Sequence, residues 1–334
     1  MNVDNNIPCQ WMYTLEGNCK EKNLLIKILN ISAICYGILA LKNVFFIIWR
    51  VYLRKVEKRG CAPLDYMVTF AFIFNLLRSV DNFIVVYNLF PEAIIFRVSF
   101  FAISWIPGAT VIYLYLAVVF RTIPRLILHR LTCKENTLWI LNTKKITPVL
   151  WTLSTITSIG LISSSVLAGY FLKEQKVKEM IIAFSAQMFF FLFINFICWI
   201  LFLYYGRILV KLTRESLTLA GMNDERKDIE KKKFDIYIHK MKMFNYIFGG
   251  ISLLFVLCLI PITIFYKKFL MEIFITNLLY CLTCNVYSII MVGIIGFFII
   301  YSEFKSRNLE GRKEPVHSTW MQTEISYQNL SRHI

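Results

Sequence analysis

Long stretches of apolar side chains alternate with short polar segments along most of this chain. Each apolar stretch is long enough to cross a hydrocarbon core of about 30 Å as a helix that rises about 1.5 Å per residue. The pattern predicts an all-α membrane protein, a bundle of seven transmembrane helices in a lipid bilayer. The predicted spans are residues 24–49, 64–87, 93–120, 148–172, 180–206, 243–266 and 273–301.

The polar segments differ in charge, and this difference predicts the orientation of the chain. Most lysines and arginines follow the first, third and fifth spans or lie in the last 33 residues, 302–334. Because Lys and Arg are retained on the cytosolic side of membrane proteins, these segments are predicted to be cytosolic. Residues 1–23 are then predicted to lie outside or in a lumen, and residues 302–334 to form a cytosolic tail.

Composition agrees with this class of protein. The chain is 57% hydrophobic and only 17% charged, whereas soluble domains carry about 25% charge. A net charge of +16 would be compatible with nucleic-acid binding, but its concentration in the predicted cytosolic segments favours the positive-inside rule instead. We therefore expect no nucleic-acid partner.

The predicted cytosolic face is strongly basic in two places. The segment 207–242 is predicted to form a helix that continues into the sixth span, with Asn223 as its N-cap. Two interpretations remain open: a solvated charged face, or a dock for anionic lipids or a partner protein. The basic residues concerned are Arg54, Lys55, Lys58 and Arg59 after the first span, and Lys231, Lys232 and Lys233 before the sixth.

The sequence offers little for catalysis or cofactor binding. All four histidines lie in predicted loops or the tail, so the spans lack the imidazole ligands of a membrane metalloenzyme. We expect no catalytic residues, no metal, no cofactor and no enzymatic activity. Of the nine cysteines, only Cys9 and Cys19 share an oxidising side, and the sequence leaves open whether they form a disulfide.

One predicted span carries both signs of charge. Arg78 and Asp81 stand three residues apart in the second span, on one helical face, with Asn75 and Asn82 nearby to supply hydrogen bonds. Charges inside a membrane are costly and mark functional sites by default. The cluster predicts either a structural ion pair facing the bundle interior or a part of a ligand site or switch.

Two further features concern motion and sorting. Pro107 and Pro261 lie inside the third and sixth spans, and each is predicted to kink its helix because proline removes a backbone donor. A kink at Pro261 would allow the cytosolic end of the sixth span to pivot. In the tail, Tyr327 and Leu330 match the tyrosine-based sorting pattern read by clathrin adaptors, a short pattern that also arises by chance.

Three stretches resemble the tobamovirus-multiplication protein family of plants, whose relatives include GPCR-like proteins of endolysosomal membranes. The first is the basic exit of the first span at residues 54–59, followed by Asn75-Leu76-Leu77-Arg78. The second is Pro107-Gly108 with Tyr115 eight residues after the proline. The third is Tyr204-Tyr205-Gly206-Arg207, which is similar to the motif that ends the fifth helix of the family.

The resemblance covers roughly residues 28–301 and implies a GPCR-like, receptor-shaped protein without known enzyme activity. It implies recruitment of small GTPases or other cytosolic trafficking factors, and an endolysosomal or vacuolar membrane; the plasma membrane is the alternative location. A ligand-activated receptor for a small or lipid-like ligand, coupled to a heterotrimeric G protein, is a second hypothesis. A transporter that uses Arg78 and Asp81 is a third.

Overall fold

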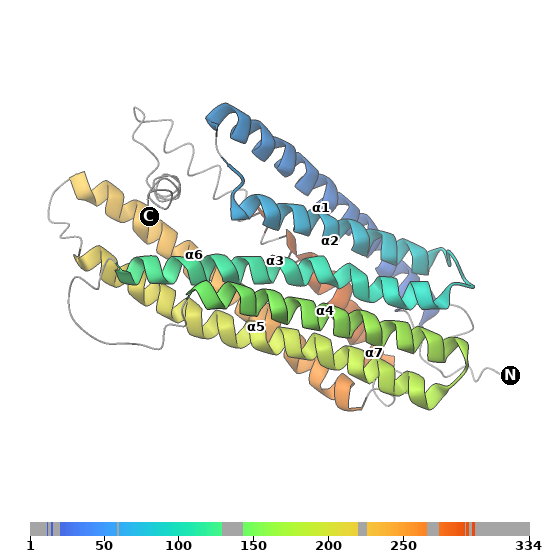
Figure 1. The fold of residues 1–334 in the computed structure, drawn as a ribbon. Helices are drawn as coiled ribbons and strands as arrows, with labels where there is room; N and C mark the ends of the chain where they lie inside the picture. Colours follow the sequence, from blue (N-terminus) through green and yellow to red (C-terminus); the bar gives the residue numbers. More distant parts are fainter. Residues whose placement is uncertain are drawn as a thin grey trace. The chain divides into compact units, whose positions relative to one another are not determined.

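The computed structural model describes the helical part of the chain. It covers residues 12, 15, 21–58, 60–128, 143–219, 226–265, 274–290, 292–293 and 296–297. Within these ranges, the side chains of residues 118–128, 143–147 and 212–241, and of some isolated positions, lie outside the description. Every regular element in the described residues is a helix (Figure 1).

Six long helices make up most of the described structure. Each contains an apolar stretch that is long enough to cross a bilayer, which indicates a multi-pass membrane protein. The helices are α1 (Lys22–Glu57), α2 (Pro63–Val86), α3 (Ile94–Leu128), α4 (Thr143–Lys173), α5 (Val177–Leu219) and α6 (Arg226–Ile264). The all-α prediction is confirmed, as are the first six predicted spans as apolar helices.

Several helices continue beyond the predicted spans. A span ends where the apolar sequence ends, but a helix continues for as long as its backbone hydrogen bonds are favourable, in water as in lipid. Thus α5 runs to Leu219, and the first part of segment 207–242 extends α5 rather than α6. The predicted continuation into the sixth span is confirmed from Arg226 onward, and the expected cap at Asn223 lies outside the described residues.

The seventh predicted span is less regular than the others. It begins as α7 (Phe274–Leu282) and continues as η2 (Thr283–Tyr287), a short π-helix, before helical backbone resumes at Ser288. Among the described residues, the apolar segment here is Asn277–Ile290, which is shorter than the six long apolar helices. Contacts divide the chain into two units, residues 1–289 and 290–334, and few residues of the second are described.

Within the first unit, helices adjacent in sequence pack against each other. Contacts join α1 to α2, α2 to α3, α3 to α4, α4 to α5 and α5 to α6, and α3 also packs on α5. Small residues allow the closest approaches: a Cβ at Gly169 of α4 would lie 2.8 Å from the Cα of Ile95 in α3. Both α7 and η2 contact α1.

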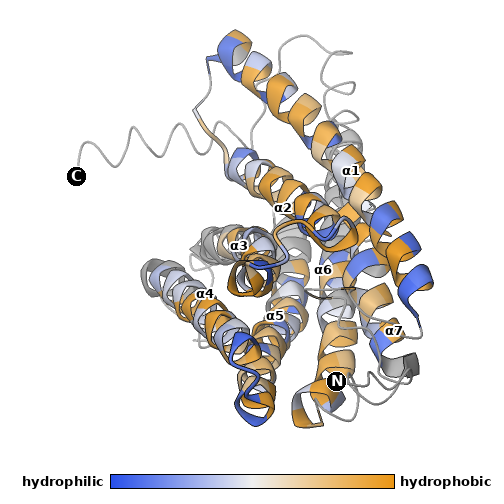
Figure 2. Ribbon diagram, turned by 90° about the vertical axis from the view of Figure 1, so that its right-hand side faces the viewer, coloured by the Kyte–Doolittle hydropathy of each residue, from blue (hydrophilic) through white to orange (hydrophobic). Residues whose placement is uncertain are grey.

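The surface of this unit is apolar along the helices. Large side chains such as Ile31, Phe45 and Ile182 are more than 60% exposed, which is unfavourable in water but suits contact with lipid. Figure 2 shows apolar residues along the lengths of the helices and hydrophilic residues towards several helix ends. By contrast, several polar side chains are buried between the helices, among them Asn75, Arg78 and Asn285.

Candidate functional site

Arg78 is the most deeply buried charged residue described. It stands about four helical turns into α2 and its side chain has no exposed surface. Its Nη1 donates to Oδ2 of Asp81 at 2.7 Å, and the Asp81 side chain is only 4% exposed. The predicted pairing across three residues is confirmed, because i and i+3 lie on one helical face.

The Arg78 guanidinium also connects α2 to two other parts of the bundle. Its Nη1 donates to Oγ of Ser104 in α3 at 3.3 Å. Its Nη2 donates to Oδ1 of Asn285 in η2 at 2.9 Å. Asn285 Oδ1 also accepts a hydrogen bond from Asn82 Nδ2 at 3.1 Å. The arginine therefore joins three segments that are far apart in sequence.

Aromatic rings surround the guanidinium. Arg78 Cζ lies 4.9 Å from the ring centroid of Trp105, 5.2 Å from that of Phe101 and 5.8 Å from that of Tyr36. Cation–π attraction of this kind gains strength where water is excluded. Three rings from α1 and α3 thus offset part of the cost of burying the charge, alongside the carboxylate of Asp81.

The π-helix is held at the same place. Asn285 Nδ2 donates to the carbonyl of Cys281 at 3.1 Å, so this side chain is fixed at both ends of its amide. The Tyr36 hydroxyl of α1 donates to the carbonyl of Cys284 at 3.2 Å. A π-helix shifts the backbone hydrogen-bond pattern by one residue, and such segments are frequent at functional sites. The Arg78 cluster, defined here as Tyr36, Arg78, Asp81, Asn82, Ser104, Trp105 and Asn285, converges on this irregular segment.

Some buried polar groups, two of them in the cluster itself and the others elsewhere in α2 and α5, have no partner among the described residues. They are Nε of Arg78, Nε1 of Trp105, both amide atoms of Asn75 and both amide atoms of Gln187 in α5. The expectation that Asn75 and Asn82 both supply hydrogen bonds to the ion pair is therefore not met. Asn82 bonds Asn285, and Asn75 retains unused donors and acceptors inside the bundle.

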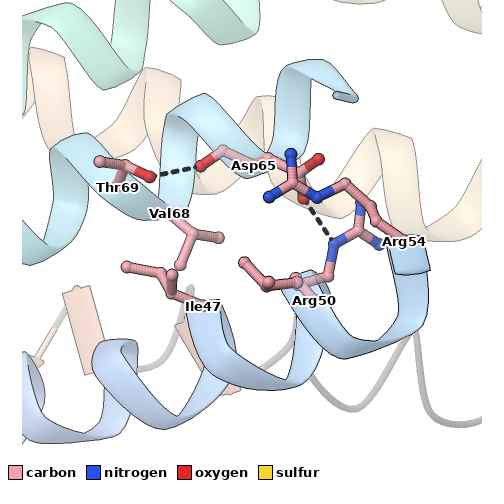
Figure 3. Close-up of a pocket in the computed structure, with 7 residues that line it drawn as sticks. Ile47, Arg50, Arg54, Asp65, Val68 and Thr69 are labelled. Carbon is pink, nitrogen blue, oxygen red and sulfur yellow. Dashed lines mark hydrogen bonds and ion pairs between the residues drawn. The ribbon is translucent and has the colours of Figure 1, made fainter. Parts of the chain in front are cut away.

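A second charged site lies where α1 leaves the apolar region and α2 begins. Arg50 Nε donates to Oδ1 of Asp65 at 2.8 Å, and Asp65 Oδ2 accepts from the backbone N–H of Ala62. Asp65 thus pairs with α1 and satisfies a backbone donor at the start of α2. Figure 3 shows Arg54 beside the pair, and Arg54 also bonds the Cys61 sulfur. The cavity here is only about 40 Å³.

The remaining predicted residues fall in three groups. Lys55 and Lys58 are exposed at the end of α1, where Lys58 adopts a left-handed conformation (φ 50°) as the C-cap. Both prolines lie inside continuous helices, Pro261 in the last turn of α6, and a bend at either stays a prediction. Outside the described residues or side chains lie Cys9, Cys19, Arg59, Lys231, Lys232, Lys233, Tyr327 and Leu330.

The motif at the end of the fifth predicted span lies inside α5. Tyr204 and Arg207 are exposed, Gly206 is buried, and the side chain of Tyr205 lies outside the description. A Cβ at Gly206 would lie 2.8 Å from Cγ of Asn245 in α6, so the glycine permits close contact between these helices. The motif is therefore a packing point of α5 on α6.

Sequence reasoning did not identify Tyr36, Ser104 and Asn285 as partners of Arg78. A hydroxyl within an apolar span gives little signal, because serine and tyrosine are common in membrane helices. Asn285 gave a clearer signal, since an amide in an otherwise apolar run needs a hydrogen-bonding partner. The sequence did not indicate which helix would supply that partner.

No protein-family model, curated protein or solved structure matches this chain. The resemblance to the tobamovirus-multiplication protein family therefore stays a prediction that rests on the motifs quoted above.

Proposed function

We propose that the protein is a seven-span, GPCR-like membrane protein with its N-terminus outside and its C-terminus in the cytosol. Its function would be non-enzymatic: recruitment of small GTPases or trafficking factors to a basic cytosolic face. Six apolar helices and the apolar segment Asn277–Ile290 support this topology, provided that the seventh span continues towards residue 301. The endolysosomal or vacuolar address is implied by the family resemblance, with the plasma membrane as the alternative.

The placement of positive charge is the observation that carries the proposal. In an alternating bundle, the end of α1, the start of α2, the end of α5 and the start of α6 lie on one side of the membrane. Basic side chains described at these ends are Arg50, Arg54, Lys55, Lys58, Arg207, Lys211 and Lys242. Retention of Lys and Arg in the cytosol makes this side the cytosolic one. A concentrated positive face also attracts acidic partners and anionic lipids.

A capture experiment tests this proposal. The purified protein in detergent would be used to capture small GTPases and other cytosolic proteins, with Lys55→Glu/Lys58→Asn as the test variant. Asparagine is chosen at position 58 because it tolerates the left-handed conformation found there. We expect captured GTPase to fall at least fivefold, because one positive charge is reversed and another is lost.

The matched control changes the same residue types at the opposite membrane face. Lys176→Glu/Lys178→Asn alters two exposed lysines at the α4–α5 turn and the start of α5. It should capture the same amount as the wild-type protein. Equal capture by all three proteins, or capture of no cytosolic factor by any of them, would contradict the recruitment function.

The Arg78 cluster favours a second candidate, a ligand-activated receptor coupled to a heterotrimeric G protein. It joins α2, α3 and a π-helix, and the unpartnered amides of Asn75 and Gln187 could receive a small polar ligand. Ligand-triggered nucleotide exchange on a G protein would distinguish this receptor from a scaffold. No exchange across a broad panel of small and lipid-like ligands would contradict it.

A further inference from the structure

A groove runs between α5 and α6 close to the end of both apolar spans. Its volume is about 350 Å³, far larger than the cavity beside Arg50. Arg207 and Lys211 of α5, one turn apart, line it together with Lys242 of α6. Among the described residues that line it there is no Asp or Glu, whereas Asp65 lines the small cavity together with Arg50 and Arg54.

The groove is polar at one end and apolar at the other. The apolar stretch of α5 ends at Ile208 and that of α6 begins at Asn245, so Lys211 and Lys242 lie just beyond the spans. Phe202 and Leu203 line the part inside the span. Tyr204 and Tyr246, both more than half exposed, stand at this level, where aromatic side chains prefer the interface of a membrane.

Asn245 provides an independent sign of a ligand. It lines the groove and is only 6% exposed. Its Oδ1 accepts a hydrogen bond from the Tyr115 hydroxyl of α3 at 3.2 Å, while its Nδ2 has no partner among the described residues. A buried N–H donor without a partner is unfavourable, because it has lost the hydrogen bonds that water would supply. An acceptor on a ligand in the groove would satisfy it.

We propose that this groove binds the headgroup of an anionic phospholipid that carries a phosphate monoester. Arg207 can hold phosphate oxygens with two parallel N–H donors, and Lys211 and Lys242 supply point charges. The Nδ2 of Asn245 would donate to a further oxygen, and the acyl chains would lie along the apolar part of the groove. Its location in the cytosolic leaflet, where anionic lipids are concentrated, rests on the proposed orientation. The binding itself requires only that α5 and α6 span the bilayer.

The position of Lys242 supports the same ligand. Lys242 is exposed, and its Nζ lies 5.9 Å from the ring centroid of Tyr246, so this cation–π contact places the ammonium beside another residue that lines the groove. Gly206 leaves room for the side chain of the buried Asn245, since a Cβ at position 206 would lie only 2.8–2.9 Å from it. The resemblance motif of α5 would thus shape a lipid site.

Direct binding tests the proposal. The full chain in a neutral detergent would be titrated with dioctanoyl phosphatidylinositol 4-phosphate, and binding followed by thermophoresis. We expect Arg207→Gln/Lys211→Gln/Lys242→Gln to weaken binding at least tenfold. The matched control, Lys173→Gln/Lys176→Gln/Lys178→Gln, removes the same charge at the opposite end of the bundle and should bind as the wild-type protein does. Equal weakening in both triple variants would overturn a specific groove.

Two single variants separate the built site from general charge. Asn245→Leu keeps the net charge and the branching at Cγ, and should weaken binding about fivefold because one donor is lost. Arg207→Lys keeps the charge but loses the paired donors, so its affinity for the lipid should lie between that of the wild type and that of the triple variant. Unchanged binding by Asn245→Leu, with an unchanged thermal unfolding midpoint, would contradict the assigned geometry.

A final binding measurement distinguishes a lipid from a soluble ligand. Inositol 1,4-bisphosphate carries the same headgroup without acyl chains and should bind at least tenfold more weakly, because the apolar part of the groove stays unfilled. If it bound as tightly as the lipid, the lipid proposal would be wrong and the groove would be a site for a soluble phosphate ligand. These measurements contain no GTPase, so their outcome is separate from that of the capture experiment.

Discussion

Two arginine–aspartate pairs in this protein have nearly the same length but very different surroundings. Arg78 and Asp81 are 2.7 Å apart, with side chains 0% and 4% exposed. Arg50 and Asp65 are 2.8 Å apart, with side chains 7% and 12% exposed. The first pair lies within one helix among apolar side chains, and the second joins α1 to α2 beside the link between them.

The comparison shows that the contact distance alone does not determine the role of an ion pair. Around Arg50, the partner Asp65 also serves the backbone of α2, and the pair fixes one corner between two helices. Around Arg78, the remaining donors extend to α3 and to the π-helix, so one side chain connects three segments. Loss of Arg78 would leave the Asp81 carboxyl buried without its ionic partner, whereas the Asp65 side chain keeps 12% exposure to water beside Arg50.

The largest expected effect is from Arg78→Met. Removing one partner of a buried pair should lower the free energy of unfolding by about 3–5 kcal/mol, because the buried Asp81 carboxyl loses its ionic partner and must either stay unpaired or take up a proton. The double variant Arg78→Met/Asp81→Leu should recover a substantial part, since neither charge remains. Mixed-micelle denaturation measures both. The comparison would fail if the double variant were less stable than Arg78→Met.

Next in size is Asn285→Leu. This change removes the acceptor of both Arg78 Nη2 and Asn82 Nδ2, and should cost about 1–3 kcal/mol for the buried donors left without a partner. Asn82→Leu is the control, because Asn285 then still accepts from Arg78, and its cost should be about half as large. The same denaturation assay applies. Equal costs for the two variants would show that the link from Arg78 to the π-helix contributes little.

A smaller effect is expected for Arg50→Gln. The Asp65 carboxylate stays partly exposed and keeps its bond to the Ala62 N–H, so the cost should be about 1 kcal/mol or less. A shift in the thermal unfolding midpoint, measured beside Arg78→Met in one detergent, would show the ranking. A loss as large as that of Arg78→Met would mean that both sites are equally shielded from water.

The smallest expected effect is a difference in salt dependence between the two ion pairs. Salt at 0.1 M largely screens exposed charges that are more than about 10 Å apart, and the screening of any pair is much weaker when the pair is buried. The stability difference between wild type and Arg50→Gln should shrink by a few tenths of a kcal/mol between about 0.05 and 0.5 M NaCl. The difference for Arg78→Met should stay constant. Equal salt dependence of both differences would remove the distinction.

Much of the fold and one ion pair of the candidate site could be predicted from the sequence alone, because the bilayer constrains both. In a bilayer, the length of an apolar run and the position of Lys and Arg are set directly by the solvent, so six helices and the Arg78–Asp81 pair could be predicted. The pair was visible because both residues are on one helix. Its partners Ser104 and Asn285 were not, because they depend on how helices pack in three dimensions.

The ends of helices and the groove were missed for related reasons. Hydropathy marks where a helix leaves the lipid, so it did not show that α5 continues to Leu219. The π-helix at Thr283–Tyr287 depends on side-chain contacts from α1 and α2, which no local pattern records. Gly206 within its motif was a usable signal, but only the contact with Asn245 shows that it shapes a basic groove.

The central claim is that α2, α3 and α4 each cross the bilayer, which places the α1–α2 link and the α4–α5 turn on opposite sides. Cysteine accessibility tests it: Cys61 is exposed in the link, and Gln175→Cys would mark the turn. Each would be the sole loop cysteine of a chain synthesised into sealed microsomes, whose outer face corresponds to the cytosol. An impermeant maleimide should label Cys61 at once and the cysteine at position 175 only after detergent is added. Equal labelling of both positions in intact microsomes would contradict the account.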